Sequence, residues 1–587
     1  MRYMRYLRGL CVALWLVAES AVSASSSAVL KYELLGLEGS LKKNAQAWLG
    51  DEPDSPQNRA NFLATYEQRL EDSLKALGYY RPDIKTSLKR TEPVWSLEID
   101  VAPGPPVLIN AISLQLLGAA STDEAFQQLL ERSPFKEGDV FNHGDYDDFK
   151  NQMLTLGQER GYFDARFTER RVTVNVESDK ADIYLHYESG QRFRFGAVEY
   201  SEFDIDPEIL AELQPIKEGD YFDQSRMQFF QAQLQRTGYF SGVVIKPLFE
   251  QAVDYRVPLS VSLYPARRHS FDVGIGYSTD TEERLSLTWR TPLLNRYGHS
   301  QLTRISYSTI NPSGQFTYMI PLTHPLDDVL HLSARLEDNE YGNLDSHQWE
   351  AGAQREIRSG KWVYSYSLRE LTESWELTGT SFNNNYTLPG FAISHSTRAG
   401  SLLDPSGGLS QLYKLEGGGA DWGSDINLLR ATANYRYIVT PLVDHRVVAR
   451  AQLGAVFIAN SDRNNLAPSL GFFAGGSQSI RAFAYQSIGN DIRLPKSDGS
   501  EKKVVVGGDR LVTASLEYQY YFTPTWRGAI FVDGGDAFDS GDFDMHVGPG
   551  FGVHYISPVG AVRLEFANSA SEDNSSWRMV FNIGAEF

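Results

Sequence analysis

The chain has 587 residues, a formal net charge of −19 and a single cysteine, and 12% of its residues are aromatic. It is too long for one ordinary domain, so we expect several. An acidic chain without basic blocks lacks the clustered lysine and arginine that phosphate contacts need, which excludes nucleic acid as a partner. No later segment has roughly 18 consecutive apolar residues, so transmembrane helices are excluded and a soluble protein or a β-barrel remains.

The first residues have the features of a secretory signal peptide, which we place at residues 1–24. A basic start is followed by an apolar stretch over residues 10–18 and by the small-x-small pattern Val22-Ser23-Ala24. The apolar stretch is shorter than the roughly 20 residues that a membrane-spanning helix needs. Cleavage would remove three arginines, one glutamate and the cysteine, so the exported chain would carry a net charge of −21 and no disulfide or thiolate metal site.

An internal repeat organises the first half of the chain. The segment Pro-Phe-Lys-Glu-Gly-Asp-Val-Phe at 134–141 recurs at 215–222 as Pro-Ile-Lys-Glu-Gly-Asp-Tyr-Phe. Each copy precedes a helical pattern that ends at a glycine followed by two aromatic residues, and an earlier step of the same kind is also present. The three steps begin at Gly78, Gly161 and Gly238, so we predict three units of about 80 residues.

Each unit is predicted to follow a β-α-α-β-β order. Glycine just past a helix adopts the left-handed cap conformation, and the aromatic residues begin the next strand. We expect helices over 61–77, 146–160 and 224–236, and strands over 172–176 and 181–187. Three generic α/β modules without a binding role are the alternative, but repeats placed before a barrel usually present sheet edges to other chains.

From about residue 270 the helical period disappears, and segments of about 9 to 14 residues alternate apolar and polar side chains. The last segment is the clearest. Its apolar face carries Trp577, Met579, Phe581, Ile583, Ala585 and Phe587. Its other face carries Arg578, Asn582, Gly584 and Glu586. This pattern is typical of a barrel in lipid with a wet lumen. A soluble sandwich also alternates, but the signal peptide, the aromatic excess and the terminal Phe587, an outer-membrane C-terminal signal, favour the membrane barrel.

Sixteen such segments are present, an even number that is typical of these barrels. They start near Phe271, Leu285, Leu302, Gln315, Val329, His347, Trp362, Phe391, Leu409, Leu428, Val447, Leu511, Ala529, His546, Ala561 and Trp577. The predicted fold is therefore a set of α+β repeats followed by an all-β, 16-stranded transmembrane β-barrel.

One connection, over about 458–509, is far too long for a hairpin, and loops longer than roughly 15 residues are usually functional or disordered. It contains the motif Gly475-Gly476-Ser477-Gln478-Ser479-Ile480-Arg481-Ala482-Phe483. This motif resembles the sixth extracellular loop of the BamA-like outer-membrane assembly superfamily, whose core is Val/Ile-Arg-Gly-Phe/Tyr, although Ala482 stands where the family usually has glycine. The continuation over 485–489 is similar to that of the TamA branch, which also has three POTRA repeats.

The resemblance implies POTRA domains over 25–104, 105–190 and 191–265, and a barrel over 266–587 whose long loop folds into the lumen. It also implies that Arg481 locks the loop by pairing with acids on the inner wall. Glu517 lies on the predicted lumen-facing register, and Asp533 lies in a segment that resembles the family's second wall motif. A guanidinium can hold carboxylates through parallel hydrogen bonds. The alternative is that Arg481 merely faces water in a wide lumen.

The first and last strands are the second candidate site. The first contains Gly274 and Gly276, and the last contains Gly584. Glycine weakens strand interiors and allows strands to kink or separate. In the family these strands form a lateral gate, at which a client strand is templated on an open edge. The alternative is that these glycines only relieve crowding inside the barrel.

The resemblance implies an insertion and assembly factor for outer-membrane proteins in a Gram-negative outer membrane, with its POTRA domains in the periplasm. Its partners would be unfolded outer-membrane clients, including autotransporters, a TamB-like periplasm-spanning protein and outer-membrane lipid, with a further role in lipid transport. We expect no cofactor, metal or catalysis, since the chain lacks a nucleophile elbow and paired-histidine spacing. The alternatives are a two-partner-type secretion pore, a lipase-type enzyme and an inert structural barrel.

Overall fold

The computed structural model describes residues 29–584 except 92, 93, 343, 378, 496–500, 559 and 573. The predicted signal peptide at 1–24 and the terminal Phe587 lie outside the described residues. Among the described helices, none is long and apolar enough to cross a membrane.

The first repeat has the predicted β-α-α-β-β order. Its elements are β1 (Val29–Leu35), α2 (Gly39–Leu49), α3 (Pro56–Ala76), β2 (Asp83–Thr91) and β3 (Val94–Ala102). The sheet order is β1-β3-β2, with β1 parallel and β2 antiparallel to β3. Helix α3 begins five residues before the predicted start, because Ser55 caps its N-terminus and Pro56 occupies its first turn.

The second repeat follows the same order. Its elements are β4 (Leu108–Leu117), η1 (Ala119–Thr122), α4 (Glu124–Glu131), α5 (His143–Arg160), β5 (Arg166–Asn175) and β6 (Lys180–Glu188), with sheet order β4-β6-β5. Gly161 ends α5 in the left-handed conformation, at φ 86°. An added Cβ at Gly161 would lie 2.7 Å from Phe222 Cβ, so the predicted cap requires glycine here.

The third repeat completes the series. Its elements are β7 (Arg194–Tyr200), α6 (Pro207–Glu212), α7 (Gln224–Arg236), β8 (Phe240–Pro247), η2 (Phe249–Gln251) and β9 (Arg256–Pro265), with sheet order β7-β9-β8. Helix α7 has the predicted bounds. The prediction of three β-α-α-β-β units is confirmed.

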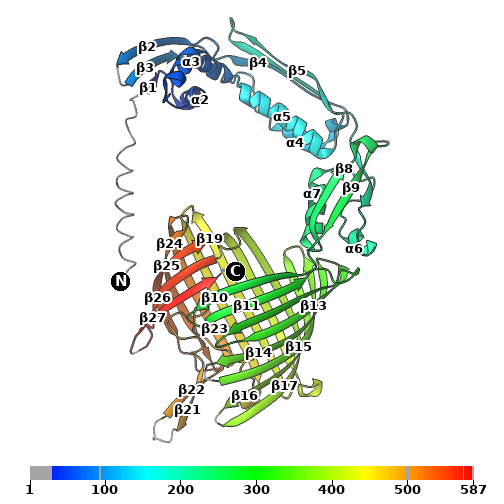
Figure 1. Ribbon diagram of the computed structural model, residues 1–587, viewed down its shortest axis with the longest axis vertical. Helices are drawn as coiled ribbons and strands as arrows, with labels where there is room; N and C mark the ends of the chain where they lie inside the picture. The colour runs from blue at the N-terminus through cyan, green and yellow to red at the C-terminus, as the bar shows by residue number, and fades with distance from the viewer. Residues whose placement is uncertain are drawn as a thin grey trace, which may run out of the picture. The chain divides into compact units, whose positions relative to one another are not determined.

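The rest of the chain forms a closed barrel of sixteen strands, as predicted (Figure 1). Each strand pairs antiparallel with its neighbour. The strands are β10 (Ser270–Ser278), β11 (Glu282–Thr291), β12 (Ser300–Ser308), β13 (Ser313–His324), β14 (Asp328–Tyr341), β15 (Leu344–Ser359), β16 (Trp362–Leu377), β17 (Thr380–Gly400), β18 (Pro405–Gly418), β19 (Leu428–Leu442), β20 (His445–Ile458), β23 (Arg510–Thr523), β24 (Trp526–Phe538), β25 (His546–Ser557), β26 (Gly560–Asn568) and β27 (Trp577–Gly584).

The alternation of side chains sorts the barrel into two faces. Along β23, Leu516, Tyr518 and Tyr520 are exposed, whereas the intervening Glu517 and Gln519 are buried inside the barrel. Apolar side chains on the outer face suit lipid, and polar side chains on the inner face satisfy one another.

One strand start was predicted wrongly. β17 begins at Thr380 and not near Phe391, because residues 380–390 continue the hairpin with β16 from Leu377↔Thr380 onward. The run Asn383-Asn384-Asn385 is polar on both faces, so it lacks the apolar alternation on which the prediction depended. The long connection after β20 also contains a hairpin, β21 (Asn490–Pro495) with β22 (Glu501–Val506), which was not predicted.

Candidate functional site

The long connection runs from β20 to β23 and forms a compact turn around the predicted motif. Gly475 and Gly476 both have φ 98°, and an added Cβ at Gly475 would lie 2.3 Å from the Ala484 carbonyl oxygen. Only glycine fits that position. The Gly476 N–H donates to the Phe483 carbonyl at 3.0 Å, which closes the turn.

The motif is packed against the inner wall of the barrel. Ile480 and Phe483 are buried in a cluster with Phe531 of β24 and Leu511 of β23. Ala482 is buried in the same cluster without a positive φ, so the usual family glycine is not needed for the backbone here. This apolar cluster holds the loop against the inner wall, because withdrawal of the loop would expose buried apolar surface to water.

Arg481 lies at the centre of a buried ion-pair cluster and is 2% exposed. Its Nε and Nη2 donate to the two Asp533 carboxylate oxygens at 2.8 Å each, and its backbone N–H donates to the same carboxylate at 3.0 Å. Its Nη1 donates to Glu517 at 2.6 Å. The structure thus brings together the three residues that the sequence analysis selected, and Arg481 does not merely face water.

Three further side chains contact Arg481 in this cluster, which we call the Arg481 cluster. Glu565 of β26 accepts a second bond from Nη1 at 3.0 Å, and the Ser515 hydroxyl accepts one from Nη2 at 3.3 Å. The centroid of the Phe531 ring lies 3.3 Å from the guanidinium carbon of Arg481. Glu565 and Ser515 are each flanked by apolar residues along their strands, so the alternation of apolar and polar side chains was the available signal. Nothing in the sequence indicated which inward residues lie at the same height.

A buried polar chain continues from the Arg481 cluster. The Arg527 Nε donates to His554 Nδ1 at 3.1 Å, so His554 carries its proton on Nε2 and donates to Glu565 at 3.0 Å. Arg527 also donates to Asp404, in the turn between β17 and β18, at 2.7 Å. Glu517, His554 and Glu565 place ligand-type atoms within 4.8 Å of one another. Both carboxylates already bind Arg481, so we interpret this set as part of the ion-pair cluster.

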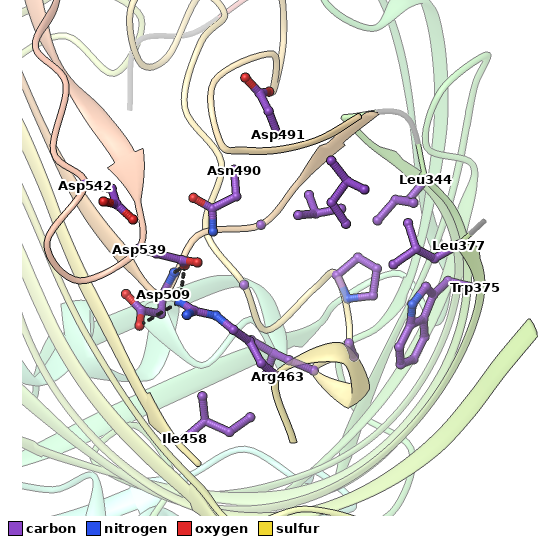
Figure 2. Close-up of a pocket in the computed structure, with 17 residues that line it drawn as sticks. Leu344, Trp375, Leu377, Ile458, Arg463, Asn490, Asp491, Asp509, Asp539 and Asp542 are labelled. Carbon is purple, nitrogen blue, oxygen red and sulfur yellow. Dashed lines mark hydrogen bonds and ion pairs between the residues drawn. The ribbon is translucent and has the colours of Figure 1, made fainter. Parts of the chain in front are cut away.

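A pocket of about 390 Å³ lies beside the base of the loop (Figure 2). Trp375, Leu344 and Leu377 form its apolar side. Opposite them, Arg463 near the start of the loop pairs with Asp509 at its end, at 3.0 Å, and with Asp539 between β24 and β25. These ion pairs fasten the two ends of the loop to each other and to the barrel rim.

The seam between β10 and β27 closes the barrel with little strand pairing. Among the described residues, Ser278↔Asn582 is the single paired position, whereas nine pairs join β10 to β11 and eight join β26 to β27. Two further hydrogen bonds join Thr279 to Phe581. The Thr279 backbone N–H donates to the Phe581 carbonyl oxygen at 3.0 Å, and the Phe581 N–H donates to the Thr279 hydroxyl at 2.7 Å.

The three glycines predicted at the seam have different neighbours in the structure. An added Cβ at Gly276 would lie 3.8 Å from the Ile583 carbonyl, so this glycine lies beside the last strand. Gly274 faces Ser286 of β11 instead. Gly584 pairs with Ala561 of β26.

Residues 267–587, more than half of the chain, match the Omp85 superfamily domain. The chain belongs to the Omp85 superfamily. Residues 31–103 match the first POTRA domain of TamA, and residues 109–190 match a POTRA domain described as a surface antigen variable number repeat. The family expected from the loop motif is confirmed.

Two relatives show the extent of the likeness. The outer membrane protein assembly factor BamA of Nitratidesulfovibrio vulgaris is 22% identical over 411 residues, which are 66% of this chain and 50% of that protein. The chain therefore spans about half the length of this curated relative. The crystal structure of Haemophilus ducreyi BamA lacking POTRA domains 1–3 has a TM-score of 0.68 at 16% identity, over 81% of this chain and 99% of that one. This second likeness shows the fold alone.

An Omp85 barrel with POTRA domains lies in the outer membrane of a Gram-negative cell, with its POTRA domains in the periplasm. The chain enters β10 from the third POTRA domain, so the first residue of β10 is at the periplasmic end. Because the strands alternate in direction, the connection over 459–509 begins and ends at the extracellular end. The Arg481 cluster therefore anchors an extracellular loop inside the barrel.

Proposed function

We propose that this protein inserts and assembles other outer-membrane proteins, and that its β10–β27 seam is the gate at which client strands enter the bilayer. The scarce pairing at the seam, one position among the described residues, carries this proposal. A strand edge with unused backbone donors and acceptors is a template for another chain. An unpaired strand edge exposes a barrel to aggregation, so its presence indicates that the edge has a function.

The POTRA sheets supply further edges for extended client segments. β2 ends the first sheet and β5 ends the second. Most side chains of β2 are exposed, and Lys85, Lys89 and Arg90 make this edge basic. Main-chain hydrogen bonding would give affinity without a sequence requirement, which suits unfolded clients. The mechanism is passive, since strand addition itself releases the free energy.

The TamA branch is the one we propose within the superfamily. Residues 31–103 match the TamA-type first POTRA domain, and the three repeats agree with that branch. We therefore propose a TamB-like periplasm-spanning partner, autotransporter-type clients among the substrates, and a role in lipid transport. A pull-down of the partner that depends on residues 31–103 is expected, and unchanged capture without them would contradict this assignment.

A disulfide across the seam tests the gate. Ser278→Cys with Asn582→Cys places thiols on the directly paired residues, and the same register extended by two residues sets Gly276 opposite Gly584. Antiparallel neighbours have Cα separations of about 4.5–5.5 Å, which a disulfide accommodates. We expect oxidation to reduce client assembly in proteoliposomes at least tenfold, and reduction to restore it.

A matched lock joins two strands that need not separate. Leu287→Cys with Ile305→Cys crosslinks β11 to β12, where eight residue pairs already exist. This control should leave assembly unchanged when oxidised. Full activity with a verified seam disulfide would contradict the gate. Ion conductance that appears only on loop withdrawal, with passage of one dedicated protein, would instead support the secretion pore.

A further inference from the structure

Asp280 connects three separate segments of the barrel at the seam. It follows β10 by two residues, and its side chain is 5% exposed. One carboxylate oxygen accepts a hydrogen bond from Arg578 Nη2 of β27 at 2.9 Å. The other accepts the backbone N–H of Ser477, in the loop motif, at 2.6 Å. A single buried carboxylate thus holds the first strand, the last strand and the loop.

Arg578 extends this connection to the Arg481 cluster. Its Nη1 donates to the Arg481 carbonyl oxygen at 3.1 Å, while its Nη2 holds Asp280. The backbone N–H and the side chain of Arg481 are bound to Asp533 of β24. Charge-assisted hydrogen bonds therefore run without interruption from the end of β10 to the wall opposite the loop motif.

The surroundings of Asp280 make these bonds important for closure. Strand pairing at the seam is limited to one position and to Thr279, so little else among the described residues joins β10 to β27. A hollow of about 240 Å³ adjoins the carboxylate and is lined by Gly276, Tyr485 and Ile583 among others. The seam is thus neither tightly paired nor tightly packed beside Asp280.

We infer that Asp280 is a latch that keeps the seam closed and couples its opening to the position of the loop. The inference rests on the proposed function, since it assigns regulation to the same gate. When the loop leaves its seat, Asp280 loses the Ser477 N–H and Arg578 loses the Arg481 carbonyl. Both losses weaken the Asp280–Arg578 pair, so loop withdrawal and seam opening occur together.

The test measures seam opening directly, without a client. The full-length protein, with Cys11→Ser and Asn582→Cys, is reconstituted in phosphatidylethanolamine–phosphatidylglycerol nanodiscs, and the rate of maleimide labelling at position 582 is recorded. We expect Asp280→Asn to accelerate labelling at least tenfold. Glu283→Gln is the matched control, because it removes one exposed carboxylate from the next strand without a described ion pair, and its labelling rate should not change.

Coupling is tested by two further variants. Arg578→Gln should accelerate labelling as Asp280→Asn does, and the effect of the double variant should be smaller than the product of the two single effects, because both variants remove the Asp280–Arg578 pair. Asp533→Asn weakens the hold on Arg481 without contacting the seam, and it should accelerate labelling severalfold. Protease resistance of the barrel and its circular dichroism verify that each variant is folded.

The outcomes separate the latch from the proposed function. A folded Asp280→Asn variant that labels at the parental rate overturns the latch, as does strict additivity of Asp280→Asn with Arg578→Gln. A parental rate for Asp533→Asn overturns the coupling to the loop. Faster labelling with unchanged client assembly, together with full activity of the oxidised seam disulfide, would support the latch and contradict insertion through the seam.

Discussion

At the scale of single residues, the guanidinium of Arg481 shows why arginine and no other cation suits the loop. It donates from Nε and both terminal nitrogens to Asp533, Glu517, Glu565 and Ser515. Asp533, Glu517 and Glu565 would repel one another if this guanidinium were removed, because the nearby Arg450 reaches Asp533 only at 4.0 Å. A lysine offers one point charge and cannot reach these partners in parallel.

Replacing Arg481 should therefore release the loop. We expect Arg481→Ala to destabilise the folded loop by about 3–5 kcal/mol, the usual cost of leaving buried charges without their partner. Arg481→Lys should recover only part of this. The measurement is the rate of proteolysis within residues 459–509 in intact proteoliposomes, and Arg398→Ala, at an exposed arginine of β17, is the control. If Arg481→Ala were cleaved no faster than the parental protein, apolar packing alone would hold the loop in the lumen.

At the scale of elements, the start of α4 in the second POTRA domain depends on one buried carboxylate. Asp123 caps the helix by accepting the Ala125 N–H at 3.0 Å, and it also accepts bonds from Arg160 at 2.8 Å and Tyr162 at 2.9 Å. Burial raises the pKa of Asp123, but the bonds from Arg160, Tyr162 and Ala125 outweigh it, so the pKa is below its ordinary value.

This lowered pKa predicts a loss of stability in acid. The ionised form of Asp123 stabilises the fold, so its contribution is complete above the ordinary pKa of about 3.9 and is lost as the pH falls towards the lowered pKa. We expect Asp123→Asn to cost about 1.5–3 kcal/mol at pH 7, as for hydrogen bonds to charged groups. Hydrogen exchange of the α4 amides checks this, with Glu124→Gln as the control. A variant that retains the parental exchange at pH 7 would contradict it.

At the scale of the whole barrel, the alternation of side chains determines how much a charged side chain destabilises the fold at each position. Leu516 is 55% exposed on the outer face of β23, and its neighbour Glu517 lies in the Arg481 cluster. The two positions are adjacent in sequence, yet one is solvated by lipid and the other by ion pairs. A charged side chain is therefore costly at position 516 and stabilising at position 517.

We predict that Leu516→Arg destabilises the barrel by about 2–4 kcal/mol, the cost of a cation near the bilayer midplane. Leu516→Phe should be nearly neutral, since the outer face is already aromatic. Reversible unfolding in liposomes measures both. A neutral arginine variant would show that residue 516 lies at the membrane surface.

The sequence by itself determined the modular plan. The repeats, the glycine caps and the two-residue period are local signals, because propensity and alternation depend only on near neighbours. They predicted three β-α-α-β-β units and sixteen strands. They failed at the start of β17, where the run Asn383-Asn384-Asn385 interrupts the apolar alternation.

Only the tertiary structure decided which inward residues meet. The alternation placed Glu517 inside the barrel and the loop motif selected Arg481, but strand tilt and register determine that Glu565 and Asp533 reach the same guanidinium. The same holds for Asp280 and Arg578, which are 298 residues apart. Closure of the barrel brings them together, and the geometry of closure is a property of all sixteen strands and of no local segment.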